Sequence, residues 1–354
     1  MKVLVEQYAP MLPRILLQLR VENDKPLANP GSGMRFVARA VAQIGAIADL
    51  DGLPFPHPTY NNGMDLAALS TEQANPASAH IDKLPTDEML RVINAEDHRV
   101  AEAVAAEIPQ ITLAVDATVE AFRRGGRLFY IGAGTSGRLG VLDASECPPT
   151  FNVPPGIVQG IIAGGEAALS RATETTEDDP AIGVRDLEAR SFTAGDVLCG
   201  IAASGRTPYV LGAVEEANRL GAVTIAISCT RDSALARMAK IAITPLTGPE
   251  VIAGSTRLKA GTATKLVLNM LTTGAFIRMG YVRGNLMVNV QPKNSKLLDR
   301  SKRIIAEATG ASYEDAARML ADAGNNVRRA IDIWEERRRK GHVRDRREKD
   351  SQNK

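Results

Sequence analysis

The sequence contains few of the residues that build disulfide frameworks and metal sites. Its 354 residues include only three cysteines, Cys147, Cys199 and Cys229, and four histidines. Three cysteines cannot complete a disulfide framework, and these three lack the close spacing of metal-ligand pairs. No two histidines are four residues apart, as they are in helical zinc sites. We therefore expect reduced thiols, as in the cytoplasm, and no bound metal.

Long hydrophobic runs and a strong charge of one sign are also missing. No apolar run approaches the roughly 18 residues of a membrane span, and Glu6, Pro10 and Pro13 interrupt the apolar N-terminus where a secretory signal would lie. The net charge of +2 argues against a dedicated nucleic-acid binder. Apolar residues make up 44% and charged residues 24%, as in ordinary globular proteins. We expect a cytoplasmic protein that binds neither membrane nor nucleic acid.

Four segments of different character follow one another along the chain. Residues 1–63 are rich in Pro and Asn around one amphipathic stretch, and we expect a weakly ordered extension or, alternatively, a regulatory arm. Residues 64–298 have the regular pattern of a folded domain. Residues 299–336 predict a small domain of three short helices, with Ser312 and Asp315 as an N-cap pair. Residues 337–354 are dense in Arg and Lys, which predicts a disordered, solvated tail or a weak phosphate or RNA contact.

Short apolar runs alternate with helix-length segments in the second of these regions. Strands are expected at residues 127–132, 157–163, 197–203, 223–228 and 241–245. Helices are expected at 86–96, at 97–124 with Pro109 either kinking or splitting this segment, and at 257–278. Near-continuous apolar strands separated by helices indicate a parallel sheet covered on both faces. The fold class is thus α/β, a doubly wound α/β/α sandwich that binds ligands at the carboxyl ends of its strands.

Two turns rich in glycine and hydroxyl groups follow expected strands and precede expected helices. Such turns bind phosphate. Their glycines let the backbone come close to the anion, and the backbone N–H groups and the positive end of the helix dipole point toward it. The first turn contributes Gly134, Thr135, Ser136, Gly137 and Arg138, and the second contributes Ser204, Gly205 and Thr207. The first also fits the G-x-G-x-x-G dinucleotide pattern, but no acidic residue ends the next strand. Either turn alone could be structural, whereas the pair favours one bound phosphate.

Acidic side chains near these turns are candidates for acid and base catalysis. Glu146 precedes Cys147-Pro-Pro149, and we expect the prolines to end a helix and hold this carboxylate in a bent segment. Glu166, Glu174 and Glu177 are expected on a helix after the second strand. Two carboxylates from different segments can divide the roles of acid and base. The residues alone do not decide between Glu174 and Glu177.

A further polar cluster lies at the start of the apolar helix expected at 257–278. Glu250, Ser255, Thr256 and Lys259 must be paired with each other or with a ligand if they are buried. Lys259 and Glu250 are therefore candidate ligands of a phosphate or of a substrate. Capping of the helix by Ser255 or Thr256 is the alternative.

These stretches resemble the sugar isomerase (SIS) domain and, within it, the N-acetylmuramic acid 6-phosphate etherase family. The matching blocks are residues 75–78, 81–82, 131–149, 163–166, 200–209, 254–268 and 284–288. The resemblance runs from about residue 65 to the terminal helices, which are similar to a ubiquitin-associated-like (UBA-like) fold. Residues 1–63 have no counterpart in it.

The resemblance implies a cofactor-independent lyase that removes D-lactate from N-acetylmuramic acid 6-phosphate, in amino-sugar catabolism and cell-wall recycling. Glu146 would then be the acid/base at the C3 oxygen and Glu177 the base at C2. Thr135, Ser136 and Ser204 would hold the phosphate. The resemblance also implies a homodimer with its active site near the subunit boundary. An amino-sugar-phosphate isomerase, or a sugar-phosphate sensor similar to the glucokinase regulatory protein, remains the alternative.

Overall fold

The computed structural model describes residues 71–171, 176–290, 292 and 294–352. The expected N-terminal extension and Glu174 lie outside these described residues. No helix in the described ranges is both long and apolar enough to cross a membrane.

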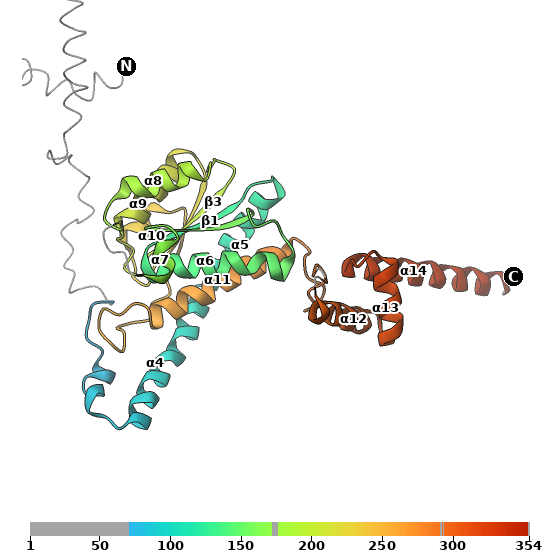
Figure 1. Cartoon of the computed structure of the whole chain (residues 1–354), viewed down its shortest axis with the longest axis horizontal. Helices are drawn as coiled ribbons and strands as arrows, with labels where there is room; N and C mark the ends of the chain where they lie inside the picture. Colours follow the sequence, from blue (N-terminus) through green and yellow to red (C-terminus); the bar gives the residue numbers. More distant parts are fainter. Residues whose placement is uncertain (1–70, 172–175, 291, 293, 353–354) are drawn as a thin grey trace, which may run out of the picture. The chain divides into compact units, whose positions relative to one another are not determined.

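A parallel sheet of five strands forms the centre of the fold (Figure 1). Its strands are β1 (Leu128–Gly132), β2 (Val158–Ile162), β3 (Val197–Ile201), β4 (Val223–Ile227) and β5 (Ile241–Ile243). They lie in the order β2-β1-β3-β4-β5, and every pair is parallel. All five fall within the segments expected from their apolar runs, so the predicted doubly wound α/β fold is confirmed.

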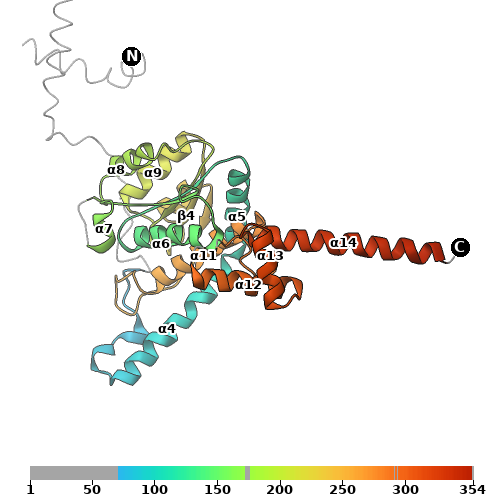
Figure 2. The same cartoon turned by 45° about the vertical axis from the view of Figure 1, so that its right-hand side comes forward.

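Helices cover both faces of this sheet (Figures 1 and 2). One face carries α8 (Pro180–Ala189), α9 (Pro208–Arg219) and α10 (Ala234–Met238). The other carries α5 (Ile108–Arg123), α6 (Gly134–Phe151) and α11 (Lys259–Arg278). The side chains of β1 alternate between the two cores, with Tyr130 in one and Phe129 in the other. Because both faces are covered, both sets must be apolar, which explains the near-continuous apolar strands.

The helices before the sheet differ from the expectation in their boundaries. After two short 3-10 helices, η3 (Pro76–Ser78) and η4 (Ile81–Lys83), α4 (Thr86–Ala106) runs unbroken through residue 96. The break comes at Glu107, and α5 begins at the next residue with Pro109 in its first turn. A proline is tolerated there because the first N–H groups of a helix have no partner within the helix. Pro109 therefore splits the expected segment into two helices, which is one of the two outcomes expected for it.

Three helices after the sheet domain share a core of their own. They are α12 (Ser295–Thr309), α13 (Tyr313–Asp322) and α14 (Val327–Gln352), packed around residues such as Ile305 and Leu320. The Oγ atom of Ser312 accepts a hydrogen bond from the N–H of Asp315, so the predicted N-cap is confirmed. Helix α14 continues to Gln352, through the basic segment for which we expected disorder.

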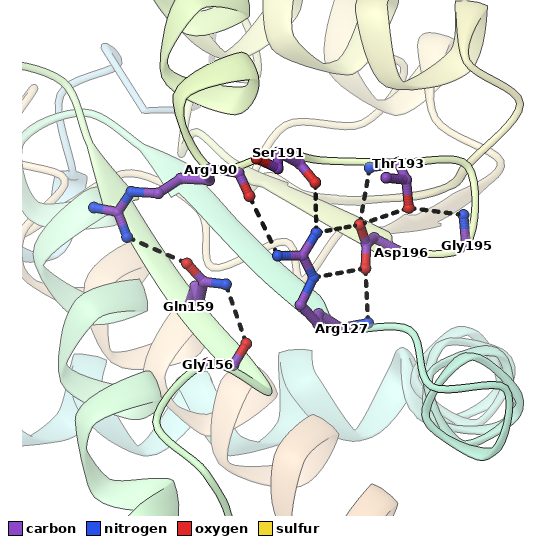
Figure 3. Close-up of polar contacts among 8 residues, drawn as sticks. All are labelled: Arg127, Gly156, Gln159, Arg190, Ser191, Thr193, Gly195 and Asp196. Atoms are coloured by element: carbon purple, nitrogen blue, oxygen red, sulfur yellow. Dashed lines mark hydrogen bonds and ion pairs between the residues drawn. The ribbon is translucent and has the colours of Figure 1, made fainter.

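An ion pair connects the beginnings of β1 and β3 at the amino end of the sheet (Figure 3). The guanidinium of Arg127 donates to Asp196 at 2.8 and 3.0 Å and to the carbonyl of Ser191 at 2.7 Å. Asp196 also accepts from the N–H and the hydroxyl of Thr193. Burial raises the pKa of Asp196, but these hydrogen bonds outweigh it and hold the pKa below its usual value. The pair fixes the two central strands at the end opposite to the candidate site.

Candidate functional site

The two hydroxyl-rich turns leave neighbouring strands at the same edge of the sheet. Strands β1 and β3 pair in parallel, with Gly132 opposite Ile201, and the turns begin directly after these residues. The strand order reverses between β1 and β3, since β2 lies beyond β1 and β4 lies beyond β3. Ligands of open α/β sheets bind at this reversal, outside the carboxyl ends of the strands. The sheet thus brings the two predicted turns together.

Free hydroxyl groups and uncapped helix ends meet at this place. Within the described part of the chain, the hydroxyls of Thr135, Ser136, Ser204 and Thr207 make no hydrogen bond, and all four residues are half-buried. Helices α6 and α9, which follow the turns, have no side-chain cap at their N-termini. Their first N–H groups and positive dipole ends therefore face the same region. This set of donors suits a phosphate.

The glycines of the two turns have different roles. Gly134 has a φ of +52°, and a Cβ atom there would meet nothing within 4 Å, so this backbone is open to a ligand. At Gly137 a Cβ would lie 2.5 Å from the carbonyl oxygen of Gly132, so this residue lets α6 pack on β1. Gly205 has a φ of +65°, and a Cβ there would lie 2.2 Å from the Oγ of Ser233. The second turn is thus held against the loop after β4.

The segment that carries Glu177 is attached to the starts of both helices. Arg138 donates to the carbonyls of Leu169 and Arg171, near the short helix α7 (Ala167–Ser170). The carbonyl of Glu177 accepts from the N–H of Tyr209, two residues after Thr207. Glu177 lies in a bend before α8 and is half-buried, so the expectation that it lies on a helix is wrong. Arg138 thus holds residues 169–171 against the start of α6, and the backbone of Glu177 lies beside the second turn.

Glu146 lies far along α6 from the two hydroxyl-rich turns. The expected bend is absent, because α6 continues through Pro148 and Pro149 to Phe151. Buried Cys147 and Phe151 on this last turn pack into the core, and this packing outweighs the poor helix propensity of proline. Twelve positions separate Gly134 from Glu146, or about 18 Å along a helix axis. The exposed carboxylate of Glu146 therefore lies well away from those turns.

A pocket of about 210 Å³ between α6 and α11 contains the Glu146 side chain. Its lining is Leu139, Leu142, Asp143, Glu146, Lys265, Leu268 and Asn269. Asp143 accepts hydrogen bonds from the Tyr130 hydroxyl at 2.9 Å and from Thr272 at 3.3 Å. Burial raises the pKa of Asp143 to about 6. Sequence reasoning missed Lys265 and Asn269, although two polar residues four apart on a largely apolar helix were a usable signal.

Lys259 and Glu250, the other suggested ligands, have partners within the protein. The ammonium of Lys259 is buried and lies 2.6 Å from Glu96, which also accepts from Asn75 at 2.8 Å. The carboxylate of Glu250 accepts from the N–H groups of Lys259 and Ala260, so it caps α11 in place of Ser255 or Thr256. This geometry indicates that both residues build the start of α11. The Glu96–Lys259 pair spans 163 residues, which no local pattern reveals.

Comparisons with known proteins identify the same fold and a family. Residues 166–274 match the SIS domain family, and residues 110–218 match the glucokinase regulatory protein N-terminal SIS domain family. The chain is 57% identical over 268 residues to N-acetylmuramic acid 6-phosphate etherase of Aeromonas hydrophila subsp. hydrophila, covering 76% of this chain and 90% of that protein. It is 54% identical to the etherase of Pectobacterium atrosepticum, covering 76% of this chain and 88% of that protein. The etherase of Jannaschia sp. is also 54% identical, covering 75% and 84%. With more than half of the aligned residues identical over most of each relative's length, the chain belongs to the N-acetylmuramic acid 6-phosphate etherase family.

Proposed function

We propose that this protein cleaves the D-lactyl ether of N-acetylmuramic acid 6-phosphate, giving N-acetylglucosamine 6-phosphate and D-lactate. The observation that carries the proposal is the site at the strand-order reversal in a chain of this family. Four hydroxyls without a hydrogen bond and two helix N-termini without a side-chain cap meet there, and the backbone of Glu177 contacts the start of the second of these helices. The reaction belongs to amino-sugar catabolism and cell-wall recycling, and the cytoplasm remains its predicted location.

The reaction requires one base, which removes the proton at C2, and one acid, which protonates the leaving oxygen at C3. The sugar opens to its aldehyde, which acidifies the hydrogen at C2, so the proposed reaction needs no cofactor. Glu177 takes the C2 proton and leaves an enolate, whose electron pair then forms the C2–C3 double bond as the C3–O bond breaks. Glu146 gives its proton to the departing lactate oxygen. Water then adds at C3 and a proton returns to C2. General acids and bases are each typically worth about 10²–10⁴ in rate.

The position of Glu146 supports a homodimer in which the partner completes each site. The phosphate of a hexose 6-phosphate is attached only three carbon–carbon bonds from C3, so a phosphate on the turns leaves C3 out of reach of a carboxylate about 18 Å along the same helix. The backbone of Glu177, in contrast, adjoins the second turn of its own protomer. We therefore place Glu177 of one protomer and Glu146 of its partner in each site.

Two features of α6 fit this arrangement. Thr135, Leu139, Leu142 and Glu146 are spaced by four, three and four residues, which puts them on one face of the helix. If two copies of α6 pack antiparallel about a two-fold axis between Leu139 and Leu142, each Glu146 is level with the partner's Thr135. Leu142 is 46% exposed in the single chain and would be covered by this contact.

Other large apolar side chains are exposed on the helices of the same layer. Helix α11 packs against α4, α5 and α6. The exposed apolar residues of these four helices include Leu90, Ile108, Leu113, Leu142, Met270 and Ile277. Sedimentation should give a dimer, and Leu142→Glu should give an inactive monomer.

The function is tested by incubating the protein with N-acetylmuramic acid 6-phosphate in deuterated water. We expect stoichiometric D-lactate and N-acetylglucosamine 6-phosphate that carries deuterium at C2. An isomerase would give a ketose and no lactate. A sensor would bind the sugar phosphate without turnover. This alternative is considered because part of the chain matches the glucokinase regulatory protein family. Either of these results would remove the proposed function.

A further inference from the structure

The pocket around Glu146 holds polar groups that the proposed acid role of Glu146 does not use. Lys265 and Asn269 lie one turn apart on α11 and both line the pocket. Both side chains are exposed in the single chain, so neither belongs to the packed core. At about 210 Å³ the pocket is smaller than the roughly 300–1,000 Å³ of typical ligand sites. It is large enough for one part of a substrate.

The chemistry of the substrate decides which part that is. If Glu146 protonates the ether oxygen at C3, the group on the other side of this oxygen must lie beside Glu146. That group is the lactyl unit, a carbon that carries a methyl group and a carboxylate. A carboxylate needs a cation or strong donors, since Asp143 and Glu146 already bring carboxyl groups to the pocket. Lys265 is the cation among the lining residues, and Asn269 has an amide donor.

We propose that Lys265 and Asn269 form a subsite for the lactyl carboxylate. The subsite rests on the proposed etherase function and deepens it, because it determines which ether is cleaved. It distinguishes a substrate with the lactyl acid from the product, which has a hydroxyl at C3. Lys265 and Asn269 hold the leaving group in position, while Glu146 provides the proton.

A purely structural role for Lys265 is the competing explanation. Its charge lies close enough to Asp143 to lower the pKa of that carboxyl against the larger effect of burial. Asp143, however, already has two hydrogen-bond donors, the hydroxyls of Tyr130 and Thr272. Asp143 therefore does not need Lys265 as a hydrogen-bonding partner. A structural role would affect all substrates equally, whereas a subsite affects only those that carry the carboxylate.

The test compares the natural substrate with its lactyl carboxamide, which has the same shape and no charge. In the wild-type protein we expect kcat/KM for the acid to exceed that for the amide roughly 10- to 100-fold, as for loss of a hydrogen bond to a charged group. Lys265→Met should lower kcat/KM for the acid by a similar factor and bring the two substrates to the same rate. Lys265→Arg should keep most of the preference. Thr262→Ala, an exposed change one turn earlier on α11, is the matched control and should change neither rate.

A second measurement separates this subsite from general damage. The addition of water is reversible, so the protein should exchange the C2 proton of N-acetylglucosamine 6-phosphate in deuterated water, and Lys265→Met should exchange it at the wild-type rate. A Lys265→Met protein that retains the wild-type preference for the acid would overturn the subsite, and so would a wild type without that preference. If the wild-type protein released no lactate, the proposed function itself would fall, and the subsite with it.

Discussion

Replacement of Lys259 by methionine separates a structural role from a role in substrate binding. The Lys259 and Glu96 side chains are 1% and 4% exposed, and their charged atoms are 2.6 Å apart. Removal of one partner from such a pair typically costs about 3–5 kcal/mol of unfolding free energy, because the other charge stays buried. Asn75 and Arg99 still contact Glu96, so we expect the lower end, about 3 kcal/mol. For a domain of this size the melting temperature should then fall by roughly 6–12 °C.

The assay is thermal unfolding followed by circular dichroism, together with KM for the sugar phosphate well below the transition. A Glu96→Met, Lys259→Met double variant is the control and should regain most of the loss, since an apolar pair leaves no buried charge. Burial raises the pKa of Glu96, but the hydrogen bonds from Lys259 and Asn75 outweigh it and lower the net pKa. The stabilisation is therefore present above the ordinary pKa of glutamate and is lost as the pH falls below it. An unchanged melting temperature with a strongly raised KM would refute the structural role.

Three further results are expected. In deuterated water, Glu146→Gln should release no lactate yet still exchange the C2 proton, whereas Glu177→Gln should lose both; normal exchange by the second variant would exclude its role as base. Gly134→Ala should raise KM, because its Cβ would enter the space that is open to the ligand, and should cost only about 1–2 kcal/mol of left-handed strain in stability. Gly205→Ala should cost more stability, because its Cβ would also collide with a neighbouring serine; an unchanged KM for Gly134→Ala would contradict this. Asp196→Asn should lower the unfolding free energy at pH 7 by about 3 kcal/mol. The difference from wild type should shrink as the pH falls below the ordinary pKa of aspartate, about 4, and should be lost as the pH passes the lowered pKa of Asp196 in the folded protein; a difference independent of pH would argue against the ion pair.

The sheet and the two turns were predictable because their signals are local. A short, continuous apolar run such as the one at Phe129 and Tyr130 indicates a strand that is covered on both faces. The turns at Ser136 and Ser204 follow such strands directly, so their place at the carboxyl edge follows from the topology. Only the register and order of the strands had to come from the structure.

The site residues that were misjudged depend on distant parts of the chain. The prolines after Glu146 were expected to end α6, but contacts of Cys147 and Phe151 with the core keep that turn helical. This continuation is what carries Glu146 away from the turns. Lys259 carries a charge that could bind a phosphate, but it is already paired with Glu96, which lies on another helix. Local sequence patterns identify side chains that could bind substrate or take part in catalysis. Long-range packing decides which of these side chains are already paired within the protein.

Mixing two inactive variants tests the central claim, that each site takes Glu177 from one protomer and Glu146 from the other. Glu146→Gln and Glu177→Gln proteins are each dissociated, combined in equal amounts and allowed to reassociate. Half of the dimers should then be mixed, and each mixed dimer should have one site with both carboxylates, so D-lactate release should return to about a quarter of the wild-type rate. If both carboxylates of a site came from one protomer, no mixture would contain an intact site, and the absence of recovered activity in proven mixed dimers would contradict the account.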